Sequence, residues 1–104
     1  MDLKIKNKVF IITGGSKGIG AGIVKLLANE EAIPVIVGRN KVDIAKIVDQ
    51  IKKNGLKIGY ALAELTNPKE CKRAVRNIIN EFGRIDGLVN NAGVNDGVGL
   101  ENGK

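Results

Sequence analysis

Short apolar runs alternate along the chain with longer segments whose apolar residues recur every three or four positions. The apolar runs predict four strands, at 8–13, 33–37, 56–62 and 84–91, and the periodic segments between them predict three helices. The first run is apolar throughout its centre, at 9–12, which is typical of a strand covered by helices on both faces. This alternation predicts an α/β fold, Rossmann-like, with right-handed crossovers and a doubly wound parallel sheet in three αβα layers.

Each predicted helix has an apolar stripe that we expect to face the sheet. Asn40 precedes the second helix as a cap, and Asn54 with Gly55 ends it. The third helix begins with a capping box of Asn67 and Glu70 around Pro68. In the first helix, at 19–29, the expected stripe is Ile19, Ile23, Leu26 and Leu27. In the second helix it is Ile44, Ile47, Val48 and Ile51, and in the third Cys71, Val75, Ile78, Ile79 and Phe82.

The first strand leads into the first helix through a glycine-rich stretch at 13–20, which reads Thr-Gly-Gly-Ser-Lys-Gly-Ile-Gly. A strand that turns through glycines into a helix can bind phosphate, because the backbone approaches the ligand closely and the helix N-terminus offers N–H groups and partial positive charge. The spacing of Gly14, Gly18 and Gly20 is a variant of the dinucleotide-binding pattern G-x-G-x-x-G. The alternative is that these glycines only form a tight turn.

The expected strand order is 3-2-1-4. Strands two and three are added on one side of the first strand and the fourth on its other side, so the order in which strands are added reverses between the first and fourth strands. Ligands of such sheets bind at the carboxyl ends of the strands beside this reversal. The glycine-rich stretch falls there, and so does a second turn, Asn90-Asn91-Ala92-Gly93. Two turn signals therefore meet at one predicted crevice.

The end of the second predicted strand bears on the choice of cofactor. In NAD-binding domains an acidic residue about 20 residues beyond the glycine turn accepts hydrogen bonds from the ribose 2′-hydroxyl. Here Val37 is followed by Gly38-Arg39-Asn40, without a carboxylate. The Arg39 guanidinium could hold a 2′-phosphate bidentately, and Lys17 could add a second cation. The pattern favours NADP, with NAD as the alternative and an ordinary exposed arginine as the plainer interpretation of Arg39.

Composition narrows the possible partners. The 104 residues suit a single domain, and 17 Lys and Arg against 11 Asp and Glu give a net charge of +6. The basic residues are dispersed and there are only three aromatic residues, too few for a base-stacking platform, so we attribute the charge to solvated helix faces and expect no nucleic-acid partner. The sequence contains no apolar run of signal or membrane-span length, one cysteine and no histidine. We therefore expect no membrane partner, no metal site and a cytoplasmic location.

The stretch at 13–20 together with Asn90-Asn91-Ala92-Gly93 resembles the short-chain dehydrogenase/reductase family, over the chain up to Gly93 and beyond. The segment 82–100, with 32–35 and Glu64-Leu65, is similar more narrowly to the bacterial L-fucose dehydrogenase branch. The resemblance implies an NAD(P)-dependent oxidoreductase that acts on a small molecule, such as a sugar hydroxyl, and whose full-length form is a dimer or tetramer.

The resemblance also implies roles for individual residues. The pyrophosphate would lie against Gly14, Gly18 and Gly20. The adenosine ribose or its phosphate would meet Ser16 and Lys17, and the nicotinamide side would meet Ile19. The adenine would lie near Glu64 and Leu65, where the family more often has Asp. The adenine-side ribose would pass close to Asn90, Ala92 and Gly93. A sugar substrate or, more simply, solvent would meet Asn95 and Asp96.

The family's reaction uses a Tyr-x-x-x-Lys pair, a Ser and a further Asn beyond the fourth strand. The only tyrosine, Tyr60, has Glu64 four residues on, so we identify no catalytic residue and expect Tyr60 to pack within its strand. We expect 1–93 to be the cofactor-binding half of an enzyme and 94–104 a glycine-rich tail, with an open fourth strand that favours self-association. The alternatives are a non-catalytic NADP-binding module and a basic nucleic-acid-binding domain.

Overall fold

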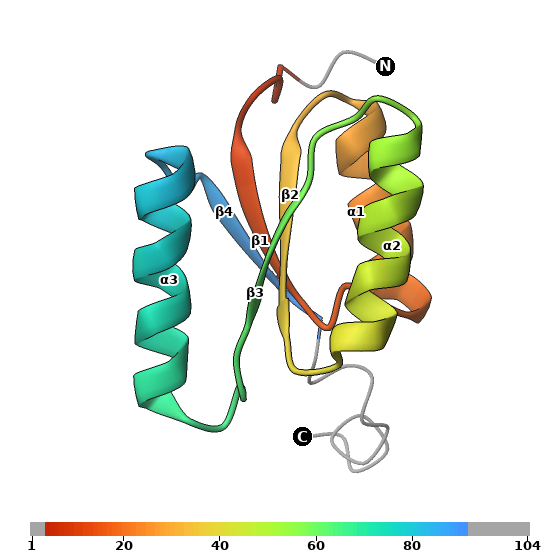
Figure 1. The fold of residues 1–104 in the computed structure, drawn as a ribbon. Helices are drawn as coiled ribbons and strands as arrows, with labels where there is room; N and C mark the ends of the chain where they lie inside the picture. Colours follow the sequence, from red (N-terminus) through yellow and green to blue (C-terminus); the bar gives the residue numbers. More distant parts are fainter. Residues whose placement is uncertain (1–3, 92–104) are drawn as a thin grey trace, which may run out of the picture.

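A four-stranded parallel sheet lies at the centre of the computed structural model, which describes residues 4–91 (Figure 1). In chain order the elements are β1 (Val9–Thr13), α1 (Gly18–Asn29), β2 (Ile33–Gly38), α2 (Lys41–Lys53), β3 (Gly59–Leu62), α3 (Pro68–Phe82) and β4 (Gly87–Asn90). The strand order β3-β2-β1-β4 confirms the predicted topology. The tail at 94–104, with Asn95 and Asp96, and the candidate residues Ala92 and Gly93 lie outside the described residues.

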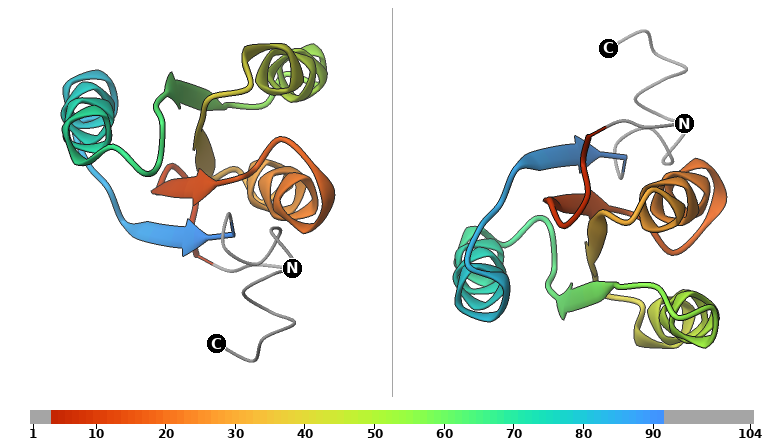
Figure 2. Two further views of the ribbon diagram at one scale, coloured as in Figure 1. Left: turned by 90° about the horizontal axis from the view of Figure 1, so that it is seen from below. Right: turned by 90° about the horizontal axis from the view of Figure 1, so that it is seen from above.

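The helices cover both faces of the sheet, as the alternating pattern predicts. Figure 2 shows α1 and α2 together on one face and α3 on the other, so the three αβα layers are confirmed. In the parallel register Thr13 lies opposite both Val37 and Asn90, and Gly38 lies opposite Leu62. The four strands therefore end nearly level, along one edge of the sheet that we call the carboxyl edge.

Two apolar cores separate the layers. Between the sheet and α1 with α2 lie Ile12, Val24, Ala28, Ile36, Ile44, Ile47, Val48, Ile51 and Ile58. Between the sheet and α3 lie Val9, Ile11, Val35, Val37, Ala63, Ala74 and Ile78. The whole stripe expected for α2 is buried, which confirms that prediction.

The stripes expected for α1 and α3 are wrong in part. In α1, Ile19 and Leu26 are 64% and 56% exposed, and the buried residues are Gly20, Val24 and Ala28. In α3, Val75 and Ile79 are 40% and 46% exposed, and the buried residues are Ala74 and Ile78. Helical spacing alone cannot distinguish two adjacent stripes. In α1 the face that contacts the sheet is the one with the smaller side chains, which let the helix approach closely.

The third and fourth strands are shorter than the predicted 56–62 and 84–91, and each begins at a glycine that packs against an aromatic ring. A Cβ atom on Gly59 would lie 2.6 Å from the Phe82 ring, and one on Gly87 would lie 2.7 Å from the Phe10 ring. Tyr60 is 49% exposed on β3, so its expected packing role is wrong. In the described sheet β4 pairs with β1 alone and leaves Leu88 65% exposed, as expected of an open edge.

Asp86 joins the start of β4 to the start of β1. Its Oδ2 accepts the Val9 N–H at 2.8 Å, and its own N–H donates to the Val9 carbonyl at 2.7 Å. The Arg84 guanidinium donates to both carboxylate oxygens, at 2.8 and 2.7 Å. The hydrogen bonds from Arg84 and from the Val9 N–H, together with the nearby positive charge, hold the pKa of Asp86 below its ordinary value against the effect of desolvation.

We predict that Asp86→Asn lowers the thermal unfolding midpoint at neutral pH, because an amide cannot pair with the charge of Arg84. A carboxyl whose folded pKa is lowered stabilises the fold fully above its ordinary pKa of 3.8, and this stabilisation is lost as the pH falls through the folded pKa. Thermal melts at decreasing pH should therefore show the unfolding midpoints of variant and wild type converging as the pH falls through the folded pKa. Asp49→Asn, on the exposed face of α2, is the control, and a difference that persists unchanged in acid would contradict the prediction.

Candidate functional site

The carboxyl edge gathers the residues that the sequence singles out. The glycine turn (residues 14–17) follows β1, Arg39 follows β2, Glu64 lies two positions after the end of β3, and Asn90 ends β4 (Figure 1; the left view of Figure 2 looks onto this edge). The structure therefore brings together ten of the twelve predicted residues: Gly14, Ser16, Lys17, Gly18, Ile19, Gly20, Arg39, Glu64, Leu65 and Asn90.

The glycines of this turn and of the start of α1 are required by the local geometry. Gly14 and Gly18 have φ of 70° and 55°, in the left-handed region that favours glycine. A Cβ atom on Gly20 would meet the Gly14 carbonyl oxygen and lie 2.7 Å from the Asn91 side-chain nitrogen. The first turn of α1 thus packs directly on the backbone that precedes it, leaving no room for a side chain.

The N-terminus of α1 has no side-chain cap. Among the three helices of residues 4–91, α2 is capped by Asn40, which accepts from the Asp43 N–H, and α3 by Asn67, which accepts from two N–H groups. In α1 the cap position is Lys17, whose side chain accepts no such bond, and the first turn contains no acidic residue. The first N–H groups of a helix have no intrahelical partner, so this end is suited to bind an anion.

Two polar residues that the sequence analysis gave no role hold β4 against the glycine turn. The Thr13 hydroxyl donates to Asn90 Oδ1 at 3.0 Å and accepts the Asn91 N–H at 3.1 Å. Asn91 is 4% exposed, and its side-chain amide donates to the Gly14 carbonyl at 3.4 Å. In the sequence, Thr13 and Asn91 are only a hydroxyl and an amide at the ends of two apolar runs. They come together because two strands far apart in the sequence pair, as in the contact between Asn91 and Gly14, 77 residues apart.

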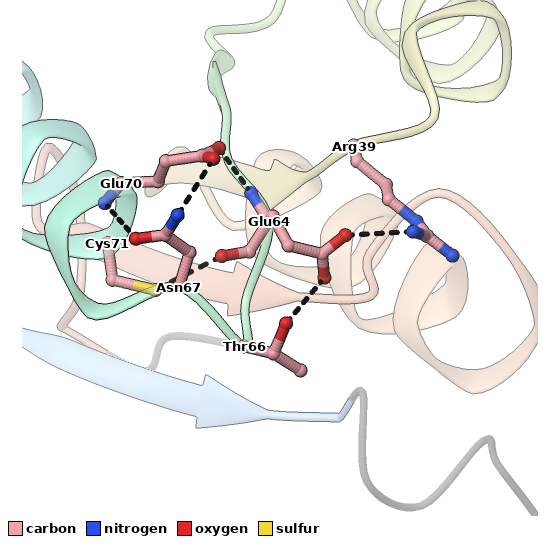
Figure 3. A network of polar contacts seen from close by, with 6 residues as sticks. All are labelled: Arg39, Glu64, Thr66, Asn67, Glu70 and Cys71. Atoms are coloured by element: carbon pink, nitrogen blue, oxygen red, sulfur yellow. Dashed lines mark hydrogen bonds and ion pairs between the residues drawn. The ribbon is translucent and has the colours of Figure 1, made fainter.

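Arg39 and Glu64 form an ion pair across the ends of β2 and β3, which Figure 3 shows with its neighbours. Arg39 Nη1 lies 2.8 Å from Glu64 Oε2, and the two side chains are 79% and 35% exposed. Thr66 Oγ1 donates to Glu64 Oε1 at 3.3 Å. Desolvation acts to raise the pKa of Glu64, but the Arg39 charge and hydrogen bonds from Thr66 and Arg39 hold it below its ordinary value. The carboxylate is therefore ionised at neutral pH.

Lys17 also lies beside a carboxylate. Its Nζ is 3.1 Å from Oδ2 of Asp43, in the first turn of α2, and the Asp43 side chain is 19% exposed. Both cations expected to attract phosphate are thus paired with an acid from a neighbouring segment. Sequence reasoning did not foresee either pairing.

An apolar hollow of about 480 Å³ opens between α3 and the sheet next to the carboxyl edge. Its lining includes Leu65, Leu88 and Val75, with Thr13 and Asn90 at the strand ends. It places Leu65 and Asn90, 25 positions apart in the sequence, in one apolar surface that could accept a flat ring.

Comparison with known proteins gives consistent matches. A family model described as short chain dehydrogenase matches residues 8–103. Chanoclavine-I dehydrogenase of Penicillium roqueforti is 40% identical over 105 aligned positions, which cover 94% of this chain and 39% of that protein. The 3-oxoacyl-(acyl-carrier-protein) reductase of Buchnera aphidicola is 38% identical over 93 positions, covering 88% of this chain and 37% of that protein. The chain thus spans less than half the length of these curated relatives.

Solved structures agree with these matches. L-Sorbose reductase from Gluconobacter frateurii, in complex with NADPH and L-sorbose, superposes with a TM-score of 0.82 at 33% identity, covering 88% of this chain and 35% of that one. A short chain dehydrogenase from Bacillus anthracis gives a TM-score of 0.79 at 38% identity, covering 85% and 35%. Within residues 4–91, no helix has the length and apolarity needed to cross a membrane.

Proposed function

The chain belongs to the short chain dehydrogenase family, and we propose that its carboxyl edge binds NADP for an oxidoreductase reaction. The observation that supports this most is the uncapped N-terminus of α1, which packs directly on the glycine turn. Its first N–H groups and the positive end of its dipole are thus both presented at the turn, where an anion could bind. When bound, the nicotinamide of such a cofactor supplies hydride transfer. The residues of this chain would bind and orient it.

We assign the binding roles by position along the edge. The pyrophosphate would be held at the backbone of Gly14, Gly18 and Gly20. The ribose or its phosphate would meet Ser16, Lys17 and Arg39. The adenine would meet Glu64 and the apolar hollow at Leu65 and Asn90. The exposed Ile19, in the first turn of α1, would face the nicotinamide side. Ala92 and Gly93 remain candidates for the adenine-side ribose by resemblance alone.

The preference for NADP over NAD rests on charge. The two residues directly after β2 are Arg39 and Asn40, neither of them acidic. The Arg39 side chain is 79% exposed although Nη1 is paired with Glu64. A guanidinium offers further N–H donors beside the paired one, so an anion can still bind to it. The structural relative L-sorbose reductase was solved with NADPH, which supports the same preference for this chain.

For the substrate we propose a sugar hydroxyl, such as that of L-fucose. Two observations support it: the likeness of 82–100 to the L-fucose dehydrogenase branch, and the similarity to an L-sorbose reductase. No residue of this chain is assigned to the chemical step, since the only tyrosine, Tyr60, has Glu64 rather than Lys four positions on.

Calorimetric titration of the chain with NADP and NAD tests the cofactor proposal. We expect Arg39→Ala to weaken NADP binding by about 10- to 100-fold, as the loss of hydrogen bonds to a charged group implies, and to change NAD affinity by less than about twofold. Arg76→Ala, which removes an exposed arginine from the middle of α3, outside the candidate site, is the matched control. The proposal would be contradicted if Arg39→Ala weakened the binding of both nucleotides equally, or if the wild type bound neither.

A further inference from the structure

We propose that Glu64 is a specificity-determining residue that limits how strongly Arg39 binds a 2′-phosphate, and thereby sets the preference for NADP over NAD. This inference rests on the proposed function. Its structural basis is the 2.8 Å contact between Glu64 Oε2 and Arg39 Nη1 at the place where the 2′-substituent of the adenosine ribose would lie.

The position of Glu64 is fixed by the start of α3 (Figure 3). The Glu64 N–H donates to Glu70 Oε1 at 2.9 Å, and the Asn67 amide donates to Glu70 Oε2 at 3.3 Å. Asn67 Oδ1 in turn accepts the N–H groups of Lys69 and Glu70, at 3.0 and 3.3 Å. The capping box of α3 therefore anchors the backbone from which the Glu64 carboxylate extends.

The side chain is held as well. The Thr66 hydroxyl occupies Oε1, which directs Oε2 toward Arg39. The Cys71 thiol lies 3.8 Å from the Glu64 carbonyl oxygen and 3.6 Å from that of Leu65, on the far side of the same turn. With both ends of the residue restrained, the carboxylate stays beside the guanidinium when a ligand arrives.

The consequence is electrostatic. A 2′-phosphate bound to Arg39 would contact the same guanidinium group as the Glu64 carboxylate. The two anions would therefore repel each other while sharing one cation. The 2′-hydroxyl of NAD carries no charge and meets no such repulsion. Removing the Glu64 charge should therefore raise the affinity for NADP relative to NAD by about threefold to tenfold at physiological salt, by Coulomb's law at near-aqueous dielectric. A changed contact between Glu64 and the adenine would affect both nucleotides alike and cancel in this ratio.

The experiment uses the whole chain with Glu64→Gln, which keeps the shape of the side chain and removes its charge. Glu31→Gln is the matched control, because Glu31 is also an exposed carboxylate beside a cation, Lys6 at 4.0 Å, but lies before β2 at the opposite edge of the sheet. Calorimetric dissociation constants for NADP and NAD are measured at low and high salt, with thermal melts to verify folding.

We expect a higher ratio of NADP to NAD affinity only in Glu64→Gln, with a gain that shrinks as salt rises and disappears when Arg39→Ala is also present. An unchanged or lower ratio of NADP to NAD affinity in a folded Glu64→Gln would overturn the inference, because it would mean that the carboxylate does not compete with the 2′-phosphate for Arg39. The proposed function fails by different results, namely a wild type that binds neither nucleotide or NADP binding that is insensitive to Arg39→Ala, and the inference then fails with it.

Discussion

Gly20→Ala will destabilise the chain by about 3 kcal/mol and abolish measurable NADP binding, the largest functional loss expected from a single methyl group. The added Cβ would meet the Gly14 carbonyl oxygen and lie 2.9 Å from the Gly15 Cα, and both are backbone atoms that cannot rotate away. Relief requires α1 to move off the glycine turn. The N–H groups at the start of α1 would then no longer converge with the turn on one anion.

Urea unfolding and calorimetric titration of the same sample measure the two effects. Gly22→Ala is the control on the same helix, because a Cβ there meets nothing within 4 Å and alanine is the better helix former. We expect it to keep NADP binding and to be neutral or stabilising by up to about 1 kcal/mol. A Gly20→Ala chain as stable as the wild type would show that the turn and helix are not packed as described.

The sequence predicts the topology well because it depends on repeated local signals. The apolar runs, the caps Asn40 and Asn67 and the glycine turn each act within a few residues, and the strand order follows from how right-handed crossovers connect parallel strands. The stripe of α2 was predictable because its large apolar residues, apart from the exposed Val42, form a single face. In α1, Leu26 and Val24 belong to different faces of one helix, and only the contact with the sheet decides between them.

The site is predictable as a place but not as a set of contacts. Register brings the glycine turn, Arg39 and Asn90 to one edge, as the strand order implies. The partners of the charged groups could not be foreseen, because Glu64 reaches Arg39 from 25 residues away and Asp43 reaches Lys17 from the next helix. The site is thus less positively charged than Lys17 and Arg39 alone suggest. For this reason the residue to test is a carboxylate, Glu64, rather than another cation.

Ile36→Ala will lower the free energy of unfolding by about 3–4 kcal/mol, as expected for truncation of a fully buried isoleucine that leaves a cavity. Ile36 is 1% exposed on β2, between β1 and β3, and lies in the core under α1 and α2. Leu26→Ala is the control, since Leu26 is as apolar but 56% exposed, and we expect it to change stability by less than about 0.5 kcal/mol. Urea unfolding at equilibrium measures both.

The same cavity should be sensed by the glycine turn, because Gly15 lies directly over it. A Cβ atom on Gly15 would be 3.0 Å from Ile12 and Val24 side-chain atoms and 3.2 Å from Ile36 Cγ1, so Gly15→Ala alone should cost about 1 kcal/mol of overpacking. In the Ile36→Ala background one of these neighbours is removed and the Ile12 and Val24 side chains have space to shift, so the cost should fall by at least about 0.5 kcal/mol. An equal cost in both backgrounds would mean that the turn relaxes independently of the core. Unequal costs would show that the glycine turn, which carries Gly14 of the proposed phosphate site, is held in place by the packing of β2.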